Sequence, residues 1–121
     1  MWGGFESRKF PRLKADCAIH IKQIDGGKSI KSVTENIGMG GICVILNESL
    51  QKFSQVKMDL DLSDGGEKIS CEGRVVWIVP SRDFVSEKLT HDTGIEFMSL
   101  PENARQRIDR LISAQHESHH N

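Results

Sequence analysis

Alternation of apolar and polar residues, repeatedly interrupted by glycine-rich turns, is the feature that most restricts the fold of this chain. The clearest segment is residues 56–62, Val-Lys-Met-Asp-Leu-Asp-Leu, in which every second residue is apolar. A period of two indicates a β-strand with one buried face and one face in solvent. Residues 15–21 alternate in the same way, and the turn residues 23–28 lead from them into a second strand, which predicts a hairpin.

Further strand-like segments follow the same scheme. We expect strands at residues 28–36, 42–46, 68–79 and 93–97. Pro80 should end the fifth of the six strands, because proline donates no ladder hydrogen bond. Six strands with no helical pattern between them predict an all-β fold, an antiparallel barrel or sandwich rather than a parallel sheet.

The last part of the chain changes period. Residues 99–102, Ser-Leu-Pro-Glu, have the spacing of a capping box, and Ala104, Ile108, Leu111 and Ile112 then fall on one helical face. This pattern predicts one C-terminal α-helix that closes an end of the barrel. We therefore divide the chain into a flexible N-terminal arm (1–14), a barrel with its helix (15–115) and a polar tail (116–121).

Size, charge and cysteine usage exclude several classes of protein. The chain has 121 residues with 16 Lys+Arg and 17 Asp+Glu, so one domain is expected, and duplex DNA and anionic membranes are poor partners. The longest large apolar run, residues 75–79, is too short to cross a bilayer, and residues 1–8 do not resemble a secretory leader, so we expect a cytoplasmic protein without membrane insertion. Cys17, Cys43 and Cys71 form no C-x-x-C pair and are interpreted as buried hydrophobic residues.

Two short elements have chemistry suited to a phosphorylated ligand. Arg8 and Arg12 stand four residues apart before the first strand, and the guanidinium fork can grip a phosphate or the O6 and N7 edge of guanine. The turn 36–41, Asn-Ile-Gly-Met-Gly-Gly, lets a ligand approach the backbone closely. It is not a Walker loop, because it continues into a strand. Alone, the arginines would be interpreted as a solvated leader and the glycines as a tight turn or bulge.

Taken together and in this order, the two elements resemble the PilZ family, the bacterial receptor domain for cyclic di-GMP. That family carries R-x-x-x-R ahead of a six-stranded barrel, Asp/Asn-x-Ser-x-x-Gly between the second and third strands, and a C-terminal helix. Arg8 and Arg12 match the first motif, while Asn36 and Gly41 match the ends of the second.

Two later segments extend the resemblance over nearly the whole chain. Residues 73–77 (Gly-Arg-Val-Val-Trp) and 94–97 (Gly-Ile-Glu-Phe) look like the family's fifth and sixth strands. The resemblance therefore implies a six-stranded antiparallel β-barrel with one C-terminal helix.

The resemblance implies a role for each matching residue. Arg8 and Arg12 would each hold a phosphate or the Hoogsteen edge of a guanine, and Lys9 would add a weaker, salt-sensitive attraction. Asn36 would meet a guanine edge with one carbonyl acceptor, where the commoner aspartate offers two charged oxygens. Gly41 would leave room for the base or ribose.

Two further positions bear on the strength of binding. Gly38 stands where the family usually has serine, so a hydroxyl that could bond the ligand is missing, which weakens binding by about 1 kcal/mol without abolishing it. Trp77 would stack on a guanine if it faces outward. Its parity with Ile69, Cys71 and Val75 favours a core position instead.

No motif predicts catalysis or a metal. Residues 59–65 begin like an EF-hand, but the glycine falls one place late and Ser70 takes the position of the final glutamate. The histidines near the end lie in a polar tail, where only adventitious metal binding is expected. We therefore expect no enzyme, no cofactor and no metal.

The function implied is a cyclic di-GMP receptor that changes its N-terminal arm and surface on binding and signals to an unidentified downstream protein, or to a second copy of the chain. The first alternative is a PilZ-like adaptor in pilus or motility assemblies that binds no nucleotide, which Gly38 favours. The second is a barrel that binds single-stranded nucleic acid, which needs a basic stripe with interleaved aromatic residues. The few aromatic residues of this chain are scattered singly, which argues against it.

Overall fold

A computed structural model describes residues 12–13, 16–24, 27–82 and 84–119 of the chain. The strands in chain order are β1 (Arg12–Leu13), β2 (Ala18–Gln23), β3 (Ser29–Gly38), β4 (Gly41–Leu46), β5 (Gln55–Asp61), β6 (Ile69–Arg82) and β7 (Leu89–Ser99), and the helix α2 comprises Glu102–His119. The predicted all-β fold with one C-terminal helix is confirmed. Residues 12 and 13, which the sequence places in a flexible arm, form the short strand β1.

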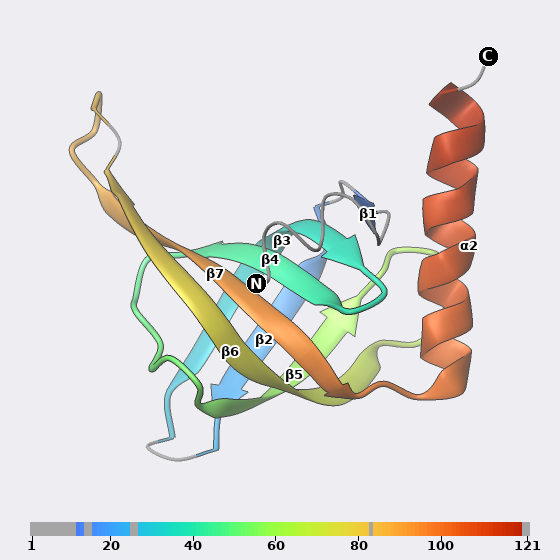
Figure 1. The fold of residues 1–121 in the computed structure, drawn as a ribbon, viewed down its shortest axis with the longest axis horizontal. Helices are drawn as coiled ribbons and strands as arrows, with labels where there is room; N and C mark the ends of the chain where they lie inside the picture. Colours follow the sequence, from blue (N-terminus) through green and yellow to red (C-terminus); the bar gives the residue numbers. More distant parts are fainter. Residues whose placement is uncertain (1–11, 14–15, 25–26, 83, 120–121) are drawn as a thin grey trace.

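The strands form a closed antiparallel barrel (Figure 1). Hydrogen-bonded neighbours follow the order β3, β2, β5, β6, β7 and β4, and β4 pairs back onto β3. The six strands of the ring therefore leave no open sheet edge along its closed part. β1 adds to β3 outside this ring, with Arg12 opposite Gly38 and Leu13 opposite Ile37.

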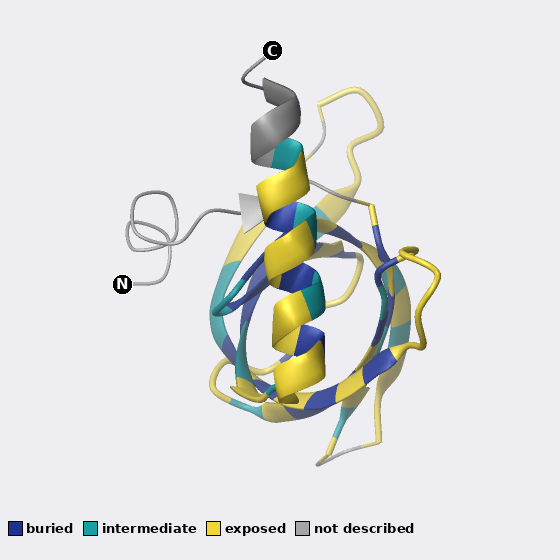
Figure 2. Ribbon diagram, turned by 90° about the vertical axis from the view of Figure 1, so that its right-hand side faces the viewer, coloured by how far each residue is buried: buried dark blue, intermediate teal, exposed yellow. Residues whose placement is uncertain are grey.

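The core fills the inside of the barrel, as the strand period predicts. On β5, Val56, Met58 and Leu60 are buried, and the residues between them face outward. Figure 2 shows buried positions distributed around the ring of strands. The side chains that exclude water most completely include Ile21, Ile37, Ile42, Leu46, Met58, Leu60, Ile95 and Ile108. These residues come from several strands and from the helix, so one core holds the domain together.

The three cysteines are free and buried, as interpreted from their spacing. Burial raises the pKa of the Cys71 thiol to about 11 and also raises the pKa of the Cys17 thiol. A raised pKa leaves almost no thiolate at neutral pH, and the thiolate is the reactive form. These cysteines therefore act as small apolar side chains.

Strands β6 and β7 continue past the barrel as a two-stranded ribbon (Figure 1). The expectation that Pro80 ends its strand is wrong, because β6 runs on to Arg82 and Pro80 pairs with His91 of β7. β5 accompanies β6 only as far as Arg74, so the ribbon has an outer edge on β6. A proline whose nitrogen faces that edge removes no ladder hydrogen bond.

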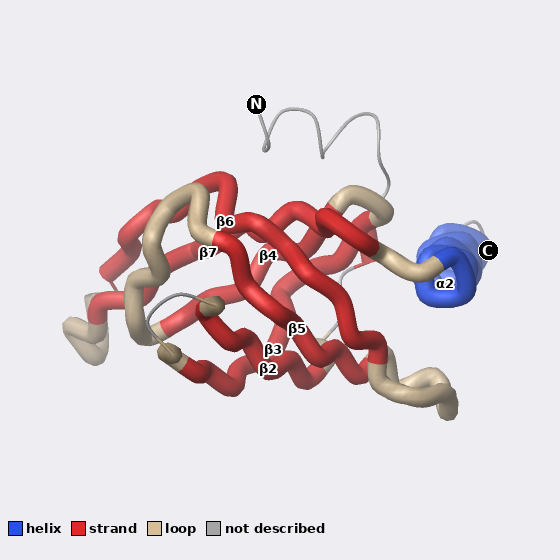
Figure 3. Tube along the Cα trace, turned by 90° about the horizontal axis from the view of Figure 1, so that it is seen from below, coloured by secondary structure: helices blue, strands red, loops and turns tan. Residues whose placement is uncertain are grey.

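Helix α2 lies across one end of the barrel (Figures 2 and 3). Ala104, Ile108 and Ile112 are buried against the core, which confirms the predicted apolar face. Ser99 is not the helix cap expected from the sequence, because it is the last residue of β7 and pairs with Glu72. The helix also continues beyond residue 115 to His119, since no glycine or proline interrupts it.

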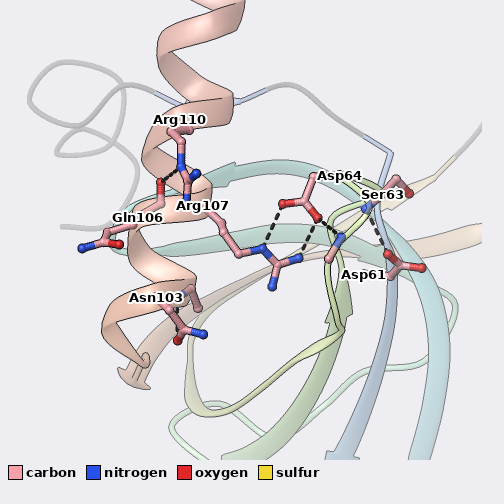
Figure 4. Close-up of polar contacts among 9 residues, drawn as sticks. Asp61, Ser63, Asp64, Asn103, Gln106, Arg107 and Arg110 are labelled. Carbon is pink, nitrogen blue, oxygen red and sulfur yellow. Dashed lines mark hydrogen bonds and ion pairs between the residues drawn. The ribbon is translucent and has the colours of Figure 1, made fainter.

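An ion pair fastens this helix to the turn between β5 and β6 (Figure 4). Arg107 donates from Nε to Oδ2 of Asp64 at 2.9 Å and from Nη2 to Oδ1 at 2.6 Å. Oδ1 also accepts a hydrogen bond from the Gly66 amide. The Arg107 hydrogen bonds hold the pKa of Asp64 well below the usual range of an aspartate. Asp64, which lies in the segment that begins like an EF-hand, therefore holds the helix against the turn.

Replacing Asp64 with asparagine should lower the free energy of unfolding by about 1–2 kcal/mol at pH 7, because a bidentate, charge-assisted contact is lost. The folded-state pKa of Asp64 is depressed, so its contribution is present above about pH 4 and declines as the pH falls further. Urea unfolding of both proteins at pH 7 and at about pH 2–3 measures this. An equal difference at the two pH values would contradict the assignment, and Arg107→Lys, which keeps the charge but loses the fork, should be intermediate.

Burial of all the cysteines predicts slow reaction with a thiol reagent in the folded protein. At neutral pH the folded protein should react many-fold more slowly than the same protein in denaturant, where all thiols become accessible. A colour-forming disulfide reagent follows the reaction directly. One thiol that reacts at the unfolded rate in the folded protein would show that its burial is incomplete.

Candidate functional site

The candidate site lies on the outer face of the barrel, where the register brings residues from four strands into one row. Asn36 of β3 pairs with Cys43 of β4, Cys43 pairs with Gly94 of β7, and Gly94 pairs with Trp77 of β6. The paired residues of the adjacent row are all fully buried; they are Ile37, Ile42, Ile95 and Val75. Because neighbouring residues on a strand point to opposite faces, the row from Asn36 to Trp77 faces outward.

Two irregularities in the ladder create this outward row. The register shifts between Thr34 and Asn36 on β3, and again between Val75 and Trp77 on β6. Thr34 and Val75 are buried, so a regular strand would turn Asn36 and Trp77 inward as well. One extra residue at each bulge reverses the face. The candidate ligand-binding side chains therefore reach the surface because of these two bulges.

The parity argument for Trp77 is consequently wrong. The sequence favours a core position, since Trp77 shares its parity with Val75, but the bulge after Val75 places Trp77 opposite Gly94 on the outer face. Val79, which has the same parity, is 52% exposed. Trp77 itself is half-buried.

Arg12, the second arginine of the N-terminal motif, meets the glycine turn through backbone pairing. Arg12 lies opposite Gly38, the residue that departs from the family pattern, at the end of β3. The turn then leads to Gly41, where β4 begins. The structure thus brings Arg12, Asn36, Gly38 and Gly41 to one region. Arg8 and Lys9 lie outside the described residues.

Charges of both signs surround the row. Gly41 pairs with Glu96, Glu96 pairs with Arg74, and Arg74 Nε lies 3.3 Å from Glu96 Oε1. On the other side, Cys43 Sγ donates to Oε1 of Glu35 at 3.8 Å. Sequence reasoning did not single out Arg74 or Glu96, although both belong to segments that carried the family resemblance.

The shape of this face suits a flat, extended ligand. Between Asn36 and Trp77 the row contains only a cysteine and a glycine, so short side chains form the floor. Three strand spacings of about 4.8 Å put the two ends of the row roughly 14 Å apart. A polar side chain at one end and an aromatic ring at the other can hold a molecule by a hydrogen-bonded edge and by a stacked ring.

A hollow of about 440 Å³ lies elsewhere, on the outer face of β2, β5 and β6. Its charged residues are of both signs, and they include Lys22, Lys57, Asp59 and Glu72. Ser70, also in its lining, donates to Oδ1 of Asp59 at 2.6 Å. The lining includes neither the glycine turn nor the row, so this hollow is not the site that the motifs predict.

Two classes of feature are missing from the part of the chain that the structure describes. No three His, Cys, Asp or Glu side chains there gather closely enough to hold a metal ion. No helix among those residues has the length and apolar character needed to span a membrane.

Comparisons with known proteins agree with the fold and the motifs. The model of the PilZ domain family matches residues 6–114. No curated protein gives a significant match.

Three solved structures illustrate the likeness. The PilZ domain of YcgR from Escherichia coli, solved with c-di-GMP, has a TM-score of 0.71 and 12% identity, over 92% of each chain. MotI (DgrA), the Bacillus subtilis inhibitor of motility, has a TM-score of 0.72 and 23% identity, over 91% of this chain and 52% of that protein. The complex of K. pneumonia MrkH with c-di-GMP has a TM-score of 0.74 and 15% identity, over 92% of this chain and 53% of that protein. The chain thus spans about half the length of MotI and MrkH.

Proposed function

This chain belongs to the PilZ domain family, and from that premise we propose that it is a receptor for cyclic di-GMP. The observation that carries the proposal is the pairing of Arg12 with Gly38, which brings the backbone of the second arginine of the R-x-x-x-R motif to the glycine turn and to the row that begins at Asn36. The structures of the YcgR domain and of MrkH with c-di-GMP support the choice of ligand.

The proposed ligand has two phosphates and two guanines, and the site offers groups for each. Arg8 and Arg12 would grip a phosphate or a guanine Hoogsteen edge through their forks, with Lys9 adding a diffuse attraction. Asn36 would accept from or donate to a guanine edge at one end of the row. Gly41 would leave the backbone open to the ligand.

Trp77 would supply the stacking surface at the other end of the row. Base–aromatic stacking contributes about 1–3 kcal/mol per base, and every base has a face that can stack. The outward position of Trp77, opposite Gly94, is what makes this role geometrically sound. Gly38, without a hydroxyl, makes the expected affinity lower than that of a domain with serine there.

Binding would act by ordering the N-terminal arm. β1 contacts both β3 and α2, so the strand that begins with Arg12 lies against the helix as well as against the site. A ligand held by Arg8 and Arg12 would favour one arrangement of the arm and so change the surface at this end of the barrel. A downstream protein, or a second copy of the chain, would bind to that changed surface in the cytoplasm.

The proposal is a binding function without catalysis or a bound cofactor. The described site supplies an amide, glycine backbone, an indole and charged pairs, which suits recognition of a planar nucleotide. The paired charges of Arg74 and Glu96 balance each other, whereas single-stranded nucleic acid requires a basic stripe. An overall charge of -1 also disfavours duplex DNA as a partner.

Calorimetric titration with cyclic di-GMP tests the proposal. The wild-type protein should bind, and Arg12→Ala should weaken binding roughly tenfold or more, because a charge-assisted fork is lost. Arg12→Lys should recover only part of the loss, since ammonium keeps the charge but not the geometry. Arg110→Ala, on the exposed side of α2, is the matched control and should bind like wild type. Absence of heat at high micromolar ligand, or an unchanged Arg12→Ala, would favour the nucleotide-free adaptor instead.

Replacing Gly38 with serine should strengthen binding severalfold, because it restores a hydroxyl worth about 1 kcal/mol. Gly38 is the last residue of β3, whose extended backbone is one that residues with side chains adopt. Gly38→Ala is the control, since it stiffens the chain without supplying a hydroxyl. Equal affinities of the serine and alanine variants would show that the hydroxyl contributes nothing.

A further inference from the structure

The indole of Trp77 rests directly on Gly94, its cross-strand partner. A Cβ built on Gly94 would overlap Nε1 and Cε2 of the indole and would lie 2.8 Å from Cδ1. An edge-on ring would bring one atom close and keep its two bonded neighbours clearly farther away. Because adjacent ring atoms all crowd the same point, the ring turns a face toward Gly94. No side chain larger than hydrogen fits at position 94 while the ring lies there.

The indole also lacks a hydrogen bond in this position. Nε1 of Trp77 is buried and has no hydrogen-bond partner among the described residues. A buried N–H without an acceptor is unfavourable, and indoles in folded proteins usually find one. Packing on Gly94, rather than a hydrogen bond, therefore fixes the ring. The unpaired indole N–H lowers the stability of the folded protein, so this orientation of the ring suggests a role other than stabilising the fold.

We propose that Gly94 is a positioning residue for ligand binding: it lays the Trp77 indole flat on the barrel and fixes its orientation, so that the part of this half-buried ring that remains exposed can stack on a ligand base. This inference rests on the proposed function, because Trp77 is the ring on which a base would stack. Gly94 itself makes no contact with the ligand. It acts through the orientation of Trp77.

The position of Gly94 in the row explains why the flat ring matters. Gly94 lies between Trp77 and Cys43, and Cys43 in turn pairs with Asn36. A ring that lies over Gly94 therefore extends the short floor of the row and keeps its other face parallel to the barrel surface. A ring lifted by a methyl group at position 94 would stand away from this floor, and a base bound at the Asn36 end could no longer bridge to it.

The first test needs no ligand. Trp2 is the other tryptophan of the chain, so a Trp2→Phe background leaves one indole to observe. In that background Gly94→Ala should move the Trp77 indole N–H resonance and shift the fluorescence emission to the red, because the ring loses its cover. Unchanged signals would overturn the assigned packing.

The second test measures binding of cyclic di-GMP by calorimetry. Gly94→Ala should bind more weakly, by a factor that approaches the loss in Trp77→Ala. A base–aromatic stack corresponds to a loss of about 5- to 150-fold. The double variant Gly94→Ala/Trp77→Ala should bind like Trp77→Ala alone, because Gly94 acts only through the ring. A further loss in the double variant, or a Gly94→Ala protein that binds like wild type with its ring displaced, would overturn the proposal.

The two measurements separate this inference from the proposed function. If the wild-type protein does not bind cyclic di-GMP, the proposed function and the inference about stacking both fail, whereas the ring packing is still decided by the spectra. If the wild type binds but Trp77→Ala binds equally well, the stacking role of Trp77 and the positioning role of Gly94 both fail, while the receptor function stands. Amide spectra of each variant verify that the barrel is intact, so that misfolding is not mistaken for lost binding.

Discussion

The pairing of β3 with β4 is the contact on which the rest of the structure depends. It joins the two ends of the strand order and turns a sheet into a barrel with a single enclosed core. The pairing contains a bulge, so that Thr34 faces inward and Asn36 outward although they are two residues apart. Closure of the barrel and exposure of Asn36, one end of the candidate site, are therefore consequences of the same irregular ladder.

Features of the fold that depend on the residue pattern within a single strand or helix could be predicted from the sequence. The alternation through residues 56–62 identifies β5 and its inward face, because each strand must bury one side. The apolar face of the helix follows in the same way from Ala104, Ile108 and Ile112. The turn after Asn36 was also predictable, since glycine at these positions has few explanations other than a turn or a close approach.

Features that depend on the pairing between strands could not be predicted from the sequence. Nothing in residues 75–77, Val-Val-Trp, shows that one residue is extra, so period-two counting assigned Trp77 to the wrong face. A proline such as Pro80 ends a strand only where both edges of that strand are paired. The sequence does not reveal that the pairing of β5 with β6 ends at Arg74. Gly94 was visible as part of a family-like strand, but its relation to Trp77 exists only across the ladder.

The helix connects the candidate site with the rest of the barrel. At the turn between β5 and β6 it is held by Arg107 and Asp64, while near the site it contacts β1, the strand that begins with Arg12. A ligand can shift an equilibrium only through contacts that differ between two arrangements of the protein. Protein cores are generally close-packed and resist rearrangement, whereas β1 is a two-residue strand paired with β3 outside the ring. Under the proposed function, the contact of β1 with α2 is therefore where we expect a bound ligand to change the surface.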